Sequence, residues 1–261
     1  MIAFALIAPH GDPAFVEGSP TNVAFEELGR RHRAVAPDAT IVLTPHNVHV
    51  DGAFGVITAG AVDGRLDDPT VEVARLVDRG LAGAVLDALH GAGLPAVGVS
   101  YGSNDRVLAE MPLDWGALIP LWFLGGDEPV VIVVPARDLP LSDHVRAGES
   151  VATACAGRRV SLVASADHGH RHDAEGPFGF HEASAEYDRR IVELIRDNRL
   201  DGLAELEPLV DDAYADSLWQ VAMLAGALGS SFDVELLSYE APTYFGMVCA
   251  AYTPSSGVHD R

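Results

Sequence analysis

Short apolar runs alternate with stretches of helical periodicity along most of the chain. Continuous apolar runs predict buried strands, and stretches with a period near 3.6 predict helices that cover a sheet. The predicted strands span residues 2–8, 40–44, 54–59, 96–100, 129–134, 158–165, 233–239 and 247–252. The predicted helices span residues 21–36, 69–89, 115–124, 138–156, 183–198 and 213–228. This alternation indicates an α/β fold with a mainly parallel or mixed central sheet and helices on both faces.

The first two predicted strands each end at a Pro-His pair. Pro9-His10 follows the first strand, and Pro45-His46 follows the second. One helix-length stretch separates the two strands, so we expect a β–α–β unit whose strands are neighbours in the sheet. Open α/β sheets bind their ligands at the carboxyl ends of parallel strands. Two histidines at this edge indicate a metal site.

Two further polar clusters follow predicted strands. Residues 165–172 contain three histidines after the strand at 158–165, and Glu240 follows the strand at 233–239. Two imidazoles and one carboxylate form the facial triad that is typical of non-haem Fe(II) oxygenases. We therefore expect His10, His46 and Glu240 to be the metal ligands. Asp12 is a candidate to orient one of the histidine rings.

Composition excludes several other functions. The formal net charge of −21 disfavours binding to nucleic acid. All 17 basic residues are arginine, so no lysine is present to form a Schiff base, anchor pyridoxal phosphate or complete a Walker A loop. No apolar run reaches the roughly 20 residues that span a membrane. Two cysteines make no disulfide framework and fit a reducing cytoplasm. A chain of 261 residues, 48% of them apolar, predicts one domain over 1–261.

Four short motifs give the chain a resemblance to a known family. They are Pro9-His10-Gly11, Pro45-His46-Asn47, the run from Ser165 to His170, and Ser238-Tyr239-Glu240. In this order, and over nearly the whole chain, they resemble the class III, LigB-type extradiol ring-cleavage dioxygenases.

The resemblance implies a single LigB-like catalytic domain that cleaves the aromatic ring of a catechol-type substrate with O2. It implies Fe(II), with zinc or manganese as alternatives, bound by His10, His46 and Glu240. It also implies that His170 is the acid/base, and the neighbouring His168 is a second candidate for this role.

The sequence departs from the family pattern at Asp114-Trp115-Gly116, where Trp115 replaces a usual pocket histidine. The candidate substrate pocket consists of Asp12, Asn47, His49, Trp115 and Tyr244. No basic cluster in the sequence marks a pocket for a carboxylate.

Two other functions stay open at this point. The change at Trp115 is compatible with a Memo-like protein of the same superfamily that has no enzymatic role. The same ligands would also suit a zinc-dependent hydrolase. If the chain is a dioxygenase, its partners are a small aromatic diol or aminophenol and O2, and related enzymes lead us to expect a homo-oligomer.

Overall fold

A computed structural model describes residues 1–67 and 70–255 and contains a mixed central sheet with strand order β10-β11-β1-β9-β2-β8-β3-β6. A smaller sheet has the order β5-β4-β7. The strands are β1 (Ile2–Ala8), β2 (Ala39–Leu43), β3 (Phe54–Ile57), β4 (Ala61–Arg65), β5 (Glu72–Leu76), β6 (Ala96–Val99), β7 (Glu110–Pro112), β8 (Val130–Val134), β9 (Val160–Ser165), β10 (Phe232–Glu240) and β11 (Met247–Pro254). The helices are α1 (Pro20–Val35), α2 (Arg79–Gly91), α3 (Trp115–Leu124), α4 (Leu141–Ala154), α5 (Glu182–Arg196), α6 (Val210–Ala213) and α7 (Leu218–Leu228), with 3-10 helices η1 (Asp12–Phe15) and η2 (Leu200–Leu209).

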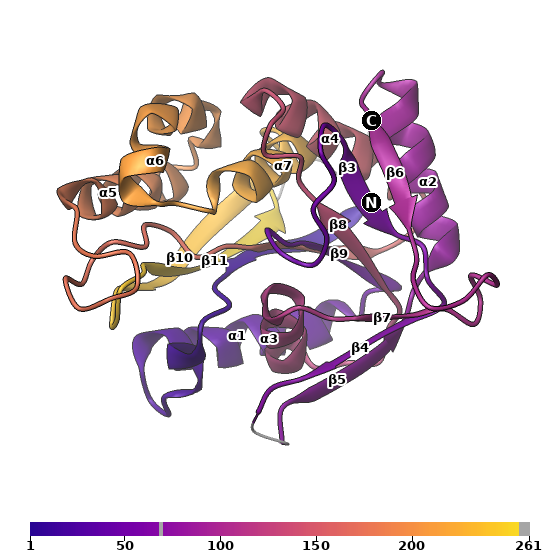
Figure 1. Ribbon diagram of the computed structural model, residues 1–261, viewed down its shortest axis with the longest axis horizontal. Coiled ribbons are helices and arrows are strands. Elements are labelled where there is room, and N and C mark those ends of the chain that lie inside the picture. The colour runs from indigo at the N-terminus through magenta and orange to yellow at the C-terminus, as the bar shows by residue number, and fades with distance from the viewer. Residues whose placement is uncertain (68–69, 256–261) are drawn as a thin grey trace.

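Helices cover both faces of the central sheet. In Figure 1, α1 and α3 lie below it with the small sheet, whereas α4 and α7 pack against each other above it. Strands β1, β9, β2 and β8 pair in parallel, as do β3 and β6. The β10–β11, β11–β1 and β8–β3 pairs are antiparallel. The predicted α/β fold with a mixed central sheet is therefore confirmed. Within residues 1–67 and 70–255, no helix has the length and hydropathy needed to cross a bilayer.

The expectation that the first two strands are neighbours is wrong. Strand β9 lies between β1 and β2, and Ala164 of β9 is in register with Ile7 on one side and Leu43 on the other. All three strands are parallel, so their carboxyl ends still meet at one edge. Insertion of β9 brings the segment 165–172 between the two Pro-His pairs, and this placement shapes the site.

Two predicted helices are shorter in the structure. The start of the helix expected at 69–89, Pro69, lies outside the described residues, and Glu72–Leu76 form strand β5 instead. Buried Val73 alternates with exposed neighbours there, which is the period of a strand. Helix α2 begins only after Asp78, whose side chain accepts a hydrogen bond from the Leu81 amide at 2.9 Å.

The helix expected over 213–228 begins later, at Leu218. Tyr214 has a left-handed φ of 51°, which ends α6 and starts a short non-helical segment. Asp216 lies in this segment, two residues before α7 begins, and not inside a helix.

Candidate metal centre

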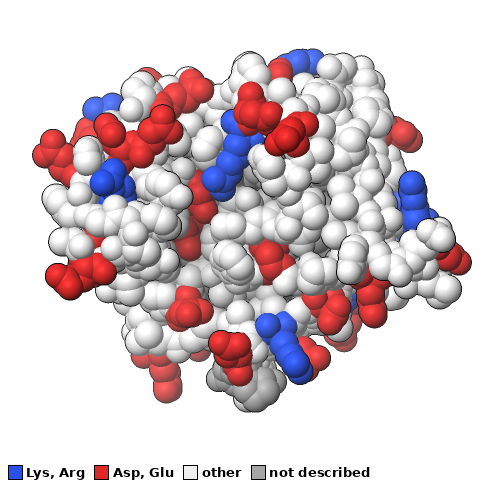
Figure 2. Space-filling model, in the orientation of Figure 1, with Lys and Arg blue, Asp and Glu red and all other residues white. Residues whose placement is uncertain are grey.

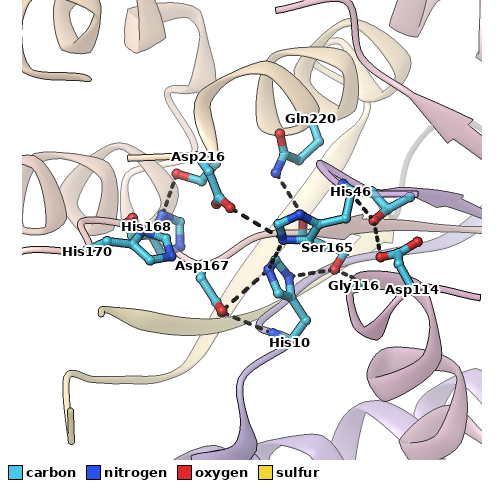
Figure 3. A network of polar contacts seen from close by, with 12 residues as sticks. His10, His46, Asp114, Gly116, Ser165, Asp167, His168, His170, Asp216 and Gln220 are labelled. Carbon is cyan, nitrogen blue, oxygen red and sulfur yellow. Dashed lines mark hydrogen bonds and ion pairs between the residues drawn. The ribbon is translucent and has the colours of Figure 1, made fainter. Parts of the chain in front are cut away.

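The two predicted histidine ligands meet at the carboxyl edge of the sheet (Figure 3). His10 follows β1 and His46 follows β2, and their Nε2 atoms lie 3.2 Å apart. The rings are nearly perpendicular, with centroids 5.0 Å apart. His10 is 2% exposed, whereas His46 is partly open to a cleft. The sequence prediction that these side chains converge therefore agrees with the geometry.

The hydrogen bonds of Ser165 fix the tautomer of His10. The Ser165 hydroxyl donates to the carbonyl oxygen of Gly116, so its oxygen is left to accept from His10 Nδ1 at 2.9 Å. The proton of a neutral His10 ring therefore resides on Nδ1, and Nε2 presents a lone pair towards His46. Ser165 is the last residue of β9, so the inserted strand orients the ring.

The segment 114–116 supports His46. The Thr44 hydroxyl donates to Asp114 Oδ1 at 3.0 Å, and the His46 amide donates to Thr44 Oγ1 at 3.3 Å. Asp114 also caps helix α3 by accepting from the Ala117 amide at 3.2 Å. The ring of Trp115 lies 4.7 Å from the His46 ring, centroid to centroid. Trp115 thus contacts the ring of His46, and Asp114 supports the His46 backbone through Thr44. The carbonyl of Gly116 positions Ser165, which orients His10.

The carboxylate beside the two histidines is that of Asp216. Among the residues that the structure describes, the ligand atoms of His10, His46 and Asp216 lie within 4.8 Å of one another. Asp216 Oδ2 is 3.7 Å from His46 Nε2. The sequence pattern does not point to Asp216, because it predicts a helix over 213–228 that contains this residue. The sequence Asp216-Ser217 before an apolar run is nevertheless a typical helix start and could have marked it.

The structure does not bring Glu240, the carboxylate predicted from the sequence, into this group. Glu240 Oε1 instead accepts a hydrogen bond at 2.9 Å from the Thr21 amide in the first turn of α1. Free amides and the helix dipole stabilise a carboxylate at this position, which gives Glu240 a structural role. The expectation that Glu240 lies beside His10 and His46 is thereby corrected.

A second carboxylate, Asp167, lies behind His10. Its Oδ1 accepts from the His10 amide at 3.0 Å, and its Oδ2 is 3.4 Å from His10 Nε2. Burial raises the pKa of Asp167 well above its usual value, and the nearby Asp216 carboxylate raises it further. Burial also raises the pKa of Asp216, although His170 and Arg137 oppose this effect.

Burial has the opposite effect on the histidines. It lowers the pKa of His10 well below its usual value and, with help from Arg137, that of His46 to about 4. Both rings are therefore neutral near pH 7 and available as ligands. Oδ1 of Asp216 is buried without a hydrogen-bond partner among the described residues. Two neutral imidazoles and an unsatisfied carboxylate fit a divalent cation, because a cation would satisfy the donor atoms that burial leaves unpaired.

These residues open onto a cleft of about 1980 Å³. Of the five predicted pocket residues, Asp12, His49, Trp115 and Tyr244 line this cleft, and Asn47 does not. The side chain of Asn47 donates to the Pro112 carbonyl at 3.0 Å, and its backbone has a φ of 76°, which asparagine tolerates better than most residues. Asn47 therefore shapes the turn after His46. The cleft also contains Arg137, which the sequence did not single out as a functional residue.

The two candidate acid/base histidines differ in their surroundings. His170 lines the cleft, and its Nδ1 donates to the His168 carbonyl at 2.7 Å, which leaves Nε2 as the acceptor. His168 is fully buried, contacts Ser217 Oγ through Nδ1 at 2.9 Å and is not a lining residue. Burial lowers the pKa of His168 to about 4. Only His170 of the pair thus has access to a ligand.

The loop that carries these histidines is anchored from α5. Buried Asp188 accepts from the Gly169 amide and contacts His172 Nε2, both at 2.8 Å. The His170 amide donates to the Ala213 carbonyl at 2.8 Å, close to Asp216 in the chain. The candidate base and the candidate carboxylate ligand therefore sit on two segments that are tied to each other.

Comparisons with known proteins show what the chain is similar to. The chain is 25% identical over 229 residues to the protein CA_C1420 of Clostridium acetobutylicum, and the match covers 84% of this chain. The chain spans about half the length (49%) of that curated relative. The crystal structure of the protein JW3007 from Escherichia coli K12 has the same fold, with a TM-score of 0.67 at 15% identity over 95% of this chain and 99% of that one. A family model described as the catalytic LigB subunit of aromatic ring-opening dioxygenase matches residues 6–249, so the chain belongs to the LigB family.

Proposed function

We propose that this protein is an Fe(II)-dependent extradiol dioxygenase that opens the ring of a catechol-type or aminophenol substrate with O2. The observation that carries the proposal is the convergence of His10, His46 and Asp216 in a chain of the LigB family. Two imidazoles and one carboxylate on one side of an ion leave positions for substrate and O2, as in other non-haem iron oxygenases. Zinc or manganese would also suit these three ligands, because ligand type alone does not select one metal.

Each residue of the site has a distinct task in this proposal. When bound, the iron would supply the electronic coupling between the aromatic diol and O2. Nε2 of His170 would take a proton from a substrate hydroxyl as the substrate binds and return it later, because Nδ1 is already committed to the His168 carbonyl. The aromatic rings of Tyr244 and Phe245, with centroids 6.1 and 5.7 Å from that of His170, would exclude water around the proton transfer.

Metal binding provides the first test. His10→Ala, His46→Ala and Asp216→Asn should each weaken Fe(II) binding by at least about 10-fold in anaerobic titrations, because each removes one donor. Glu240→Gln is the matched control, since it alters a carboxylate that caps α1, and it should bind Fe(II) like the wild type. The reverse pattern, with Glu240→Gln losing iron and Asp216→Asn keeping it, would refute this ligand set.

Oxygen uptake provides the second test. The iron-loaded protein should consume O2 with at least one catechol or aminophenol, and His170→Gln should retain iron but lose about 100-fold or more in kcat. A zinc-dependent hydrolase or a protein without enzymatic activity would show no O2 uptake with any of these substrates. That result would exclude the dioxygenase.

A further inference from the structure

Arg137 lies in the cleft without the short ion pairs that other arginines make. It follows β8, whose carboxyl end is at the same edge of the sheet as His10 and His46. Its nearest carboxylate is Asp216, with an Nη2–Oδ2 distance of 3.9 Å, which is too long for a hydrogen bond. By contrast, Arg31 and Arg146 contact their carboxylate partners at 2.6 and 2.8 Å.

Stacking, and not hydrogen bonding, positions this guanidinium group. Its Cζ lies 4.8 Å from the centroid of the Trp219 ring, on the first turn of α7. Within 1–67 and 70–255, the contacts of Arg137 are this stacking and the 3.9 Å approach to Asp216, and neither is a hydrogen bond. The side chain is only 35% exposed and lines the cleft. A partly buried guanidinium that is held by stacking, and whose five N–H groups have no acceptor at hydrogen-bond distance among the described residues, can bind a planar anion.

The charge of the cleft makes such a residue necessary for an acidic ligand. The chain carries a net charge of −21, and Asp12, Asp167 and Asp216 line the same cleft. Those of these carboxyl groups that are ionised repel an anion, and a cation beside the ligand's carboxylate offsets that repulsion. The remainder of the cleft wall includes Trp115, Phe178 and Tyr214, whose faces suit an aromatic ring.

We propose that Arg137 binds a carboxylate on the substrate, so that the ligand of this cleft is an aromatic acid and not a neutral phenol. This inference rests on the proposed function for the identity of the ring as a diol or aminophenol. The fork of the guanidinium binds the carboxylate in a bidentate manner, and Trp219 holds the fork in place. The acid group thereby determines which end of the ring faces His10, His46 and Asp216.

Equilibrium binding to the metal-free protein tests the inference without any turnover. The probes are 4-hydroxybenzoate and its neutral analogue 4-hydroxybenzamide, followed by calorimetry and tryptophan fluorescence. The wild type should bind the acid at least about 10-fold more tightly than the amide, as expected for a charge-assisted hydrogen-bond pair. Arg137→Gln should abolish this preference, and Arg137→Lys should retain part of it because the charge remains.

Arg65→Gln is the matched control, because it removes the same charge from the lining of the same cleft. It should change the ratio of acid to amide affinity by less than about 2-fold. Equal affinity of the wild type for acid and amide, no measurable binding of the acid, or an undiminished preference in Arg137→Gln would each overturn the inference.

Oxygen uptake separates this inference from the proposed function. If the iron-loaded protein consumes O2 with catechol but Arg137→Gln does not alter acid binding, the inference fails and the dioxygenase stands. If no diol supports O2 uptake but the preference for the acid depends on Arg137, the dioxygenase fails and the carboxylate site stands.

Discussion

At the residue scale, the site depends on a close approach that only glycine allows. A Cβ on Gly116 would lie 2.6 Å from Thr44 Oγ1, 2.7 Å from Asp114 Oδ1 and 3.1 Å from Cδ2 of His46. Thr44 Oγ1 and Asp114 Oδ1 support the His46 backbone, and Cδ2 belongs to the His46 ring. A methyl group at Gly116 would therefore displace both the backbone and the ring of His46. The backbone of Gly116 is helical, so space and not conformation selects glycine at this position.

Gly116→Ala should therefore weaken metal binding by about 10- to 100-fold and destabilise the fold by about 1–3 kcal/mol, as overpacking does. Gly83→Ala is the matched control, because Gly83 lies in α2 and a Cβ there meets no atom within 4 Å. This control should bind metal normally and gain about 0.5–1 kcal/mol in stability. Metal titration and urea denaturation measure both effects, and wild-type metal affinity in Gly116→Ala would contradict the account.

Two of the three candidate metal ligands could be identified from the sequence. His10 and His46 could be predicted because each directly follows a buried strand, and strand ends converge. The third ligand could not be assigned in this way, because Glu240 follows a predicted strand whereas the predicted helix over 213–228 contained Asp216. Tertiary contacts distinguish the two carboxylates: Asp216 lies beside His46, and Glu240 accepts from the Thr21 amide, 219 positions away in the chain.

At the element scale, a buried polar contact joins α1 to the central sheet. His32 Nε2 of α1 lies 2.9 Å from Glu128 Oε1, and the Thr40 hydroxyl of β2 donates to the same oxygen at 2.7 Å. His32 also contacts Ser161 Oγ of β9 at 3.1 Å through Nδ1. Burial alone raises the pKa of Glu128, but the hydrogen bonds with His32 and Thr40 outweigh burial and lower this pKa to about 2.

A carboxylate whose pKa is lower in the folded state stabilises the protein above its unfolded pKa, and this contribution disappears as the pH falls. Glu128 should therefore stabilise the fold above pH 4.5 and lose this effect between pH 4.5 and about 2. Over this range the wild type should lose up to about 3 kcal/mol more than Glu128→Gln in urea denaturation. Glu205→Gln, at an exposed glutamate of η2, should follow the wild type. Parallel curves for wild type and Glu128→Gln would contradict the prediction.

At the scale of the whole molecule, acidic charge dominates the surface. Figure 2 shows acidic side chains scattered over one face, most densely over the region of α5 and α6, with fewer basic groups between them. Several arginines are already paired with glutamates, such as Arg189 with Glu186 and Glu193. The net charge of −21 therefore acts as self-repulsion in the compact state.

Salt should stabilise this protein by screening that repulsion. Raising NaCl from about 0.01 M to about 1 M shortens the Debye length from about 30 Å to about 3 Å. Tm should rise, by about 2–4 °C for each kcal/mol of repulsion removed. The double variant Glu205→Gln/Glu207→Gln, on exposed positions of η2, should have a higher Tm at low salt and a smaller response. Thermal unfolding measures this, and a falling Tm would mean that ion pairs outweigh the net charge.

The sequence by itself determined the α/β fold, most of the strands and the convergence of His10 and His46. It could do so because burial of apolar runs and the period of helices are local properties of the chain. The tertiary structure alone decided that β9 separates β1 from β2, that Asp216 completes the histidine pair and that Arg137 stacks on Trp219 in the cleft. These features depend on contacts between residues far apart in the chain, and such contacts form only when whole elements pack.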